Sequence, residues 1–151
     1  MKSGRINPWA VAVFAWIGVI FFSSTSIAGE WSEIVFTSIA GLLFGNLRTE
    51  DTSYGLVHLL ADKGFHVALF CVLAILLWNL FSNSRWKEAR ILIAGAVVGS
   101  CSEFLQRFFP GRDPAIRDVL INIGGTALGI AAMLTMARLR SRTRAEALIE
   151  S

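Results

Sequence analysis

Long apolar stretches alternate along this chain with short polar connections. An α-helix rises about 1.5 Å per residue, so about 20 apolar residues cross a hydrocarbon core of roughly 30 Å. Four stretches approach or reach that length, namely residues 8–27, 65–81, 89–109 and 119–137. The pattern therefore predicts an all-α, polytopic membrane protein with four transmembrane helices.

A fifth stretch, residues 31–47, is apolar only in patches. Glu30 precedes it, Glu33 lies within it, and Gly41 and Gly45 interrupt it. A short, broken pattern of this kind is typical of a segment that lies in the membrane interface or re-enters the membrane from one side. We therefore expect a short interfacial or re-entrant segment between the first two spans.

The first apolar stretch has an alternative interpretation as a signal peptide. Basic residues precede it, and it ends in Ser26-Ile27-Ala28, which resembles a signal-peptidase site. The apolar run is nearer to about 20 residues than to the roughly 7 to 15 of a signal h-region. It also contains Trp9 and Trp16. These two features favour a retained transmembrane helix.

Composition and charge agree with a membrane protein. Hydrophobic residues make up 54% of the chain and charged residues 17%, which is too apolar for an ordinary soluble domain. Nine of the 14 Lys and Arg residues lie at the amino end, in residues 82–90 between the second and third spans, or after residue 137. Cytoplasmic loops carry the excess of Lys and Arg, so both termini are predicted to be cytoplasmic. The net charge of +3 then reflects a basic inner rim, and no nucleic-acid partner is expected.

The chain reads as one transmembrane domain, residues 1–137, followed by a basic cytoplasmic tail, residues 138–151. Four arginines lie within the first half of this tail. We expect the tail to lie along the anionic inner membrane surface or to be partly disordered.

The candidate site residues are polar groups at or just inside the edges of the apolar stretches, where ionisable side chains are costly. They are Lys63, His66, Glu103, Gln106, Arg112, Asp118 and Asn122. The three helical pairs among them are spaced three or four residues apart, so each pair shares one helix face. All seven lie on the predicted outer side, which predicts one outer polar pocket. Glu103 should face the bundle, either protonated or paired with Lys63 or Arg112.

The same residues resemble those of the VanZ-like family, which is named after an accessory protein of teicoplanin resistance. The motifs that carry this resemblance are Trp16 with Ser23-Ser24, Lys63-Gly64-Phe65-His66, Glu103-Phe104-Leu105-Gln106, Phe109-Pro110-Gly111-Arg112, and Asp118 with Asn122, Gly125 and Gly129. The resemblance implies a small multi-pass protein of the bacterial cytoplasmic membrane with its polar motif at the outer face. A role in the response to glycopeptide antibiotics is inherited from the resemblance alone.

Two functions from different classes are compatible with these residues. In the first, the pocket binds an anionic amphiphile such as a lipid-linked cell-wall precursor, with Lys63 and Arg112 on the phosphate or carboxylate. The other polar side chains would then orient the ligand. In the second, the protein is an intramembrane enzyme acting on a lipid-linked or peptidoglycan substrate, with His66 or Glu103 as general acid or base.

A purely structural four-helix scaffold is the remaining alternative, because polar side chains also hydrogen-bond across helices. His66, Glu103 and Asp118 could ligate a divalent metal, but a single histidine without a dense ligand motif argues against it. We therefore expect no metal and no cofactor. Small residues four apart recur at Gly95 and Gly99 and at Gly125 and Gly129. This spacing indicates close helix packing, within the chain or between copies.

Overall fold

The structure is a computed structural model, and it describes residues 7–44, 52–110 and 114–149. These residues form helices and turns, with no strand among them, which confirms the all-α prediction. The five helices are α1 (Pro8–Ser23), α2 (Ser26–Phe44), α3 (Thr52–Leu80), α4 (Lys87–Gln106) and α5 (Ile116–Ile149).

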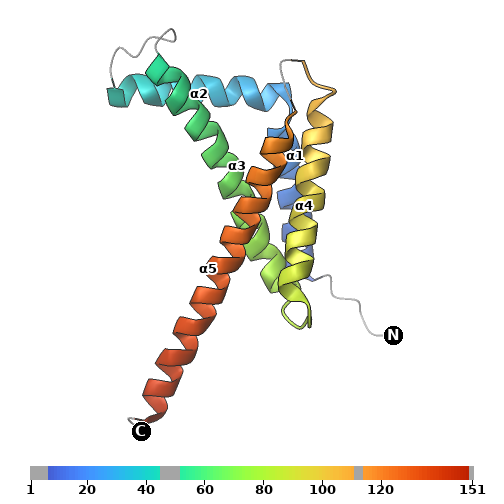
Figure 1. The fold of residues 1–151 in the computed structure, drawn as a ribbon, viewed down its shortest axis with the longest axis vertical. Coiled ribbons are helices and arrows are strands. Elements are labelled where there is room, and N and C mark those ends of the chain that lie inside the picture. The colour runs from blue at the N-terminus through green and yellow to red at the C-terminus, as the bar shows by residue number, and fades with distance from the viewer. Residues whose placement is uncertain (1–6, 45–51, 111–113, 150–151) are drawn as a thin grey trace.

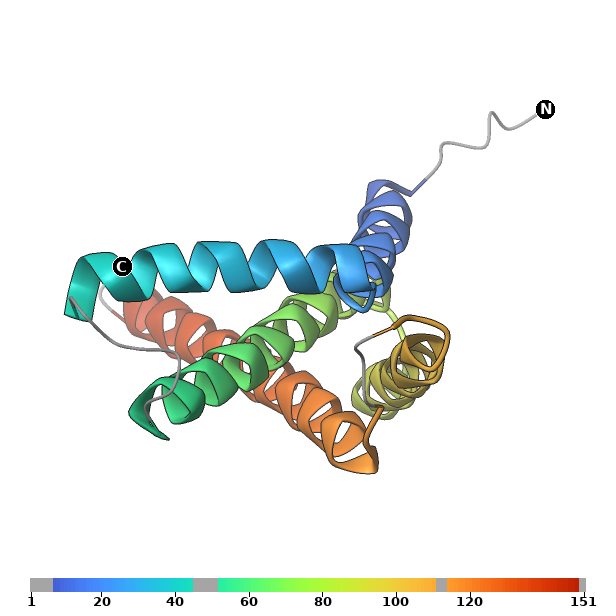
Figure 2. The same cartoon turned by 90° about the horizontal axis from the view of Figure 1, so that it is seen from above.

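Helices α1, α3, α4 and α5 form a bundle, and α2 lies crosswise at one of its ends (Figure 1). α3 is the central helix, since it packs against α1, α4 and, most extensively, α5. Seen from above, α3 and α5 cross one another, and α2 runs from the end of α1 along one side of the bundle (Figure 2). α1 begins and α5 ends on the side opposite to α2 (Figure 1).

The first predicted span, residues 8–27, is divided into two helices. α1 starts at Pro8, and the side chain of Asn7 accepts a hydrogen bond from the Trp9 backbone N–H at 3.0 Å. Proline suits the first helical position because its missing N–H would have no intrahelical partner there. α1 ends at Ser23, and the Thr25 hydroxyl then accepts a hydrogen bond from Ala28 N in the first turn of α2. Hydroxyl side chains at this turn therefore end one helix and start the next.

α2 is continuous from Ser26 to Phe44, so Gly41 does not break it as the sequence pattern suggested. One glycine inside a helix costs only about 1 kcal/mol, which neighbouring residues offset. The crosswise orientation in Figure 1 fits the interfacial alternative for this segment better than the re-entrant one. Residues 45–47 of the predicted segment lie outside the described residues.

Two helices are long and apolar enough to cross a membrane by length and composition, over Gly55–Leu80 in α3 and Ile116–Ala147 in α5. α1 is apolar but shorter. α4 carries Lys87, Glu88 and Arg90 in its first turn and Glu103 near its end, and it is not among these membrane-capable helices. The four-span topology is thus supported for two helices and not established for the other two.

The structure also moves two predicted boundaries. α3 begins well before the predicted residue 65, and α5 continues through the predicted tail to Ile149 instead of ending at residue 137. Residues 138–149 contain no Gly or Pro and several strong helix formers, so nothing in this segment ends the helix.

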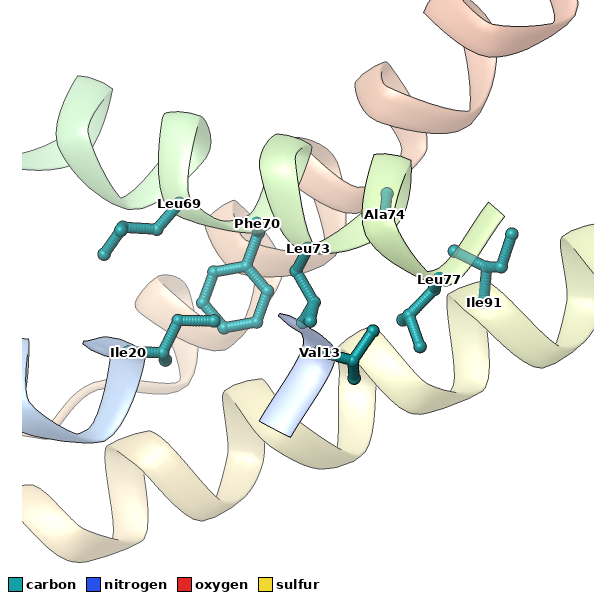
Figure 3. Packing of buried hydrophobic residues seen from close by; sticks show 8 residues of the cluster. All are labelled: Val13, Ile20, Leu69, Phe70, Leu73, Ala74, Leu77 and Ile91. Atoms are coloured by element: carbon teal, nitrogen blue, oxygen red, sulfur yellow. The ribbon is translucent and has the colours of Figure 1, made fainter. Parts of the chain in front are cut away.

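A narrow apolar core lies along α3. Five of its members come from α3, and α1 and α4 supply the others (Figure 3): Val13, Ile20, Leu69, Phe70, Leu73, Ala74, Leu77 and Ile91. Many other large apolar side chains are exposed on the outside of the helices, including Phe14, Ile93 and Leu128. Such extensive exposed apolar surface is unusual for a water-soluble monomer. Together with the apolar helices, it indicates a membrane protein.

The glycine pairs lie at helix contacts, as predicted. A Cβ added to Gly125 would lie 2.6 Å from the Val67 carbonyl oxygen of α3, and one on Gly129 would lie 2.6 Å from the Cys71 carbonyl oxygen. A Cβ on Gly95 of α4 would meet the Thr126 side chain of α5 instead of backbone. At Gly125 and Gly129 the helices therefore approach so closely that only glycine fits.

Candidate functional site

Buried polar side chains gather where α1 and α4 end and α5 begins, on the side of the bundle crossed by α2 (Figure 1). We call this group the polar cluster. Its members are Ser24, Lys63, His66, Ser102, Glu103, Gln106, Asp118 and Asn122. All of them are buried except Lys63, which is partly buried. Buried polar groups in proteins nearly always have hydrogen-bond partners. Their partners therefore decide what the cluster can do.

The strongest interaction in the cluster joins α3 to α5. Lys63 Nζ donates to Asp118 Oδ2 at 2.8 Å and lies 3.0 Å from Asp62 Oδ2. The Lys63 and Asp118 side chains are 22% and 10% exposed, so the pair is mostly shielded from solvent. Arg117 Nε lies 3.6 Å from the other Asp118 oxygen. The ammonium of Lys63 is thus already neutralised by two carboxylates.

Glu103 has weaker contacts. Its residue is 4% exposed, and its carboxylate accepts long hydrogen bonds, both at 3.4 Å, from Gln106 Nε2 and from Ala115 N. Within the described ranges no Lys or Arg forms an ion pair with it. The sequence-based alternative of a Glu103–Lys63 pair is wrong, because Asp118 takes the lysine instead. The other suggested partner, Arg112, lies outside the described residues.

His66 and Asn122 are neighbours, and both contain buried polar atoms without hydrogen-bond partners. These atoms are His66 Nδ1, Asn122 Nδ2 and Asn122 Oδ1, counted over the part of the chain that the structure describes. Asn122 is completely buried. Leaving a buried polar group unpaired costs about 1–3 kcal/mol, so native proteins rarely keep one without a use for it. Asp118 Oδ1 is likewise buried without a hydrogen-bond partner, so free hydrogen-bonding capacity in the described cluster lies at His66, Asn122 and this oxygen, and the His66 and Asn122 side chains lie within interaction range of one another.

Comparison with known protein families decides the identity of the chain. The family model described as VanZ/LLP1 matches residues 9–138. The chain belongs to the VanZ/LLP1 family. Searches of curated proteins and of solved structures gave no match. Every described member of the polar cluster lies inside the range matched by the VanZ/LLP1 model.

The structure adds two residues, Ser102 and Thr126, to this end of the VanZ/LLP1 bundle. Ser24 and Ser102 share a hydrogen bond of 2.7 Å that joins α1 to α4, and the Thr126 hydroxyl donates to the Asn122 carbonyl oxygen at 3.0 Å. Ser24 belongs to the Ser23-Ser24 motif noted in the sequence, whereas Ser102 and Thr126 were not singled out there. Helical spacing carried the missing signal, because both lie four residues from a predicted site residue, Gln106 and Asn122 respectively.

The residues that the structure describes contain no group of side chains arranged to bind a metal ion. No three His, Cys, Asp or Glu side chains there come together as a metal site, so His66, Glu103 and Asp118 do not form the triad considered from the sequence. The free cysteines are Cys71, which is half-buried, and Cys101, which is exposed. The described cluster offers groups for hydrogen bonding, charge pairing and proton transfer.

Replacing Asn122 with leucine is expected to raise the free energy of unfolding by about 1–2 kcal/mol, because it removes an unpaired buried amide. Thr126→Val is the matched control, since Thr126 is equally buried but already has a hydrogen-bond partner. We expect this control to be neutral or slightly destabilising. The measurement is unfolding of the purified proteins in detergent. If Asn122 served only to hold helices together, Asn122→Leu would instead lower stability.

Proposed function

We propose that this VanZ/LLP1 protein is a multi-pass protein of the bacterial cytoplasmic membrane that binds an anionic amphiphile at its polar cluster. The proposed ligand class is a lipid-linked cell-wall precursor, such as a polyprenyl phosphate. Both termini would be cytoplasmic, and the polar cluster would lie at the outer face. Binding of this kind would modulate sensitivity to teicoplanin, a role suggested by the family name.

The observation that carries the proposal is the unpaired, buried polar pair of His66 and Asn122 next to the Lys63–Asp118 ion pair. Unpaired donors and acceptors give a ligand hydrogen bonds that the protein itself does not make, and they fix its orientation. An anionic headgroup would compete with Asp62 and Asp118 for the Lys63 ammonium. Arg117 is mostly exposed beside Asp118 and offers a second cation at the rim.

The alternative function is an intramembrane enzyme that uses His66 or Glu103 as acid or base. The features that favour it are a buried Glu103 carboxylate with only long hydrogen bonds on α4 and a His66 imidazole nitrogen without a hydrogen-bond partner on α3. Such a pair has the functional groups for proton transfer. Binding and catalysis would use the same residues, so a measurement of substrate turnover is needed to distinguish the two functions.

Glu103→Gln separates the two functions. The substitution preserves the size of the side chain and removes its negative charge. The new amide group then faces two hydrogen-bond donors, Gln106 Nε2 and Ala115 N. If the cluster only binds, affinity for a polyprenyl phosphate in nanodiscs should shift by about tenfold, because the substitution removes a buried negative charge close to the site of the anionic headgroup. If the protein is an enzyme, binding should largely survive and conversion of the lipid should stop.

Glu88→Gln is the matched control, because Glu88 is an exposed glutamate in the first turn of the same helix. It should change neither binding nor turnover. Teicoplanin and vancomycin sensitivity of a susceptible host, at equal membrane levels of the wild type, Glu103→Gln and Arg112→Ala, extends the test to cells. A wild-type protein that neither binds nor converts the lipid would contradict both functions.

A further inference from the structure

α5 continues as a helix well beyond the rest of the bundle, on the side opposite to α2 (Figure 1). This part of the helix carries four arginines, which we call the arginine collar: Arg138, Arg140, Arg142 and Arg144. All four are exposed, and within the described ranges none of them forms an ion pair with an acidic side chain. The collar is therefore a concentrated positive charge that the described chain does not neutralise, and it attracts anions.

The arginines are divided between opposite faces of α5. Arg138 and Arg142 are four residues apart and share one face. Arg140 and Arg144 share another, and a step of two residues turns the helix by about 200°, so the two faces point in nearly opposite directions. A helix that lies along a membrane surface instead gathers its basic residues on one face and apolar residues on the other. The collar thus favours a helix that passes through the membrane surface over one that lies on it.

The place of the collar along α5 matches the layers of a bilayer. No charged residue lies between Asp118 and Arg138. The segment from Ile116 to Ala137 is about 32 Å long, close to the roughly 30 Å of a hydrocarbon core. The collar adds about 9 Å, comparable with the roughly 5–8 Å of one headgroup layer. If α5 crosses the membrane, its four guanidinium groups therefore lie at headgroup depth.

We infer that the arginine collar binds the phosphates of anionic phospholipids all around α5, where the helix leaves the bilayer on the side opposite to the polar cluster. This inference goes beyond the proposed function, because it concerns the other end of α5 and holds for any ligand of the polar cluster. The planar guanidinium fork matches phosphate oxygens. Lipids surround a spanning helix, so they reach both faces of the collar, whereas one docked protein would cover a single face.

A second copy of this protein is a poor occupant of the same surface. Two copies related by a two-fold axis along the membrane normal would place equivalent residues at the same depth, so one collar would meet the other. No described acidic side chain pairs with the collar, and the two sets of arginines would repel. Anionic headgroups have the opposite charge and lie at the same depth.

The test measures the lipid selectivity of the full-length protein in nanodiscs that contain phosphatidylcholine and phosphatidylglycerol. Native mass spectrometry gives the ratio of the two lipids that stay bound to the released protein. The wild type should retain phosphatidylglycerol preferentially. Arg138→Gln/Arg142→Gln and Arg140→Gln/Arg144→Gln should each lower this preference by about fivefold or more, the factor expected for the attraction of one basic residue to an anionic surface.

Ser141→Gln/Thr143→Gln is the matched control, because it introduces two glutamines at exposed positions of the same turns without removing charge. It should keep the wild-type preference. Similar losses in the two arginine pairs would support the collar. A loss confined to one pair would mean that only one face binds, and it would overturn the collar.

A wild type without preference for phosphatidylglycerol would also overturn the inference. If that protein bound soluble polyglutamate instead, the arginines would be assigned to an acidic partner outside the membrane. These measurements leave the proposed function untouched, since its ligand is tested separately with Glu103→Gln. Loss of lipid selectivity with intact binding at the polar cluster, or the reverse, therefore distinguishes failure of one proposal from failure of the other.

Discussion

Gly129→Val is expected to destabilise the bundle by about 3 kcal/mol or more, the largest effect of any single change considered for this protein. A Cβ on Gly129 would lie 2.6 Å from the Cys71 carbonyl oxygen and 2.7 Å from Ala74 Cβ. The first of these neighbours is backbone, which cannot rotate away as a side chain can. α3 and α5 would have to separate, and they form the most extensive helix contact in the fold.

Gly124→Ala is the matched control for this prediction. Gly124 lies in the same helix, yet a Cβ there would meet nothing within 4 Å. Alanine at this position should stabilise the helix by about 0.5–1 kcal/mol, because glycine loses more conformational freedom on folding. Unfolding of the purified proteins with a denaturing detergent, followed by circular dichroism, gives both values. Equal effects of the two substitutions would mean that α3 and α5 are not in close contact.

The second large effect is expected for Lys63→Met, which should lower the free energy of unfolding by about 3 kcal/mol. The substitution leaves the Asp118 carboxylate buried with only Arg117 nearby, 3.6 Å from one oxygen. An uncompensated buried charge is far more costly than the absence of both charges. The double variant Lys63→Met/Asp118→Leu should therefore recover most of the lost stability while losing ligand binding.

Lys87→Met makes the same chemical change near the other end of the bundle. Lys87 Nζ lies 3.6 Å from the ring centroid of Trp78, a cation–π contact outside the polar cluster. Its loss should cost about 0.5–1 kcal/mol. The same denaturation series measures all three variants. If Lys63→Met proved no more harmful than Lys87→Met, the α3–α5 ion pair would contribute little to the fold.

Both predictions concern the contact between α3 and α5, at two positions along it. Gly125 and Gly129 bring α5 against α3, and that approach places Asp118 next to Lys63 at the end of the same contact. A substitution that separates the helices should therefore also disturb the polar cluster. Ligand binding by glycine variants is informative only when their folding has been measured.

The sequence by itself determined the helical class, the apolar character and the family of this protein. Each depends on local pattern: helical spacing, the length of apolar runs and short motifs in a fixed order. The same spacing placed Lys63 with His66 on one helix face, Glu103 with Gln106 on another and Asp118 with Asn122 on a third, and it identified the glycine pairs as packing positions.

Only the tertiary structure decided which faces meet. Lys63 pairs with Asp118 and not with Glu103, α2 lies crosswise at one end of the bundle, and α5 continues as a helix beyond the other end. Helical periodicity fixes which residues share a face, because it depends on neighbours along the chain. The rotation and crossing of each helix depend on contacts between residues far apart in sequence, such as Gly129 against Cys71. Partner choice in the polar cluster follows from those contacts, and a single sequence does not reveal them.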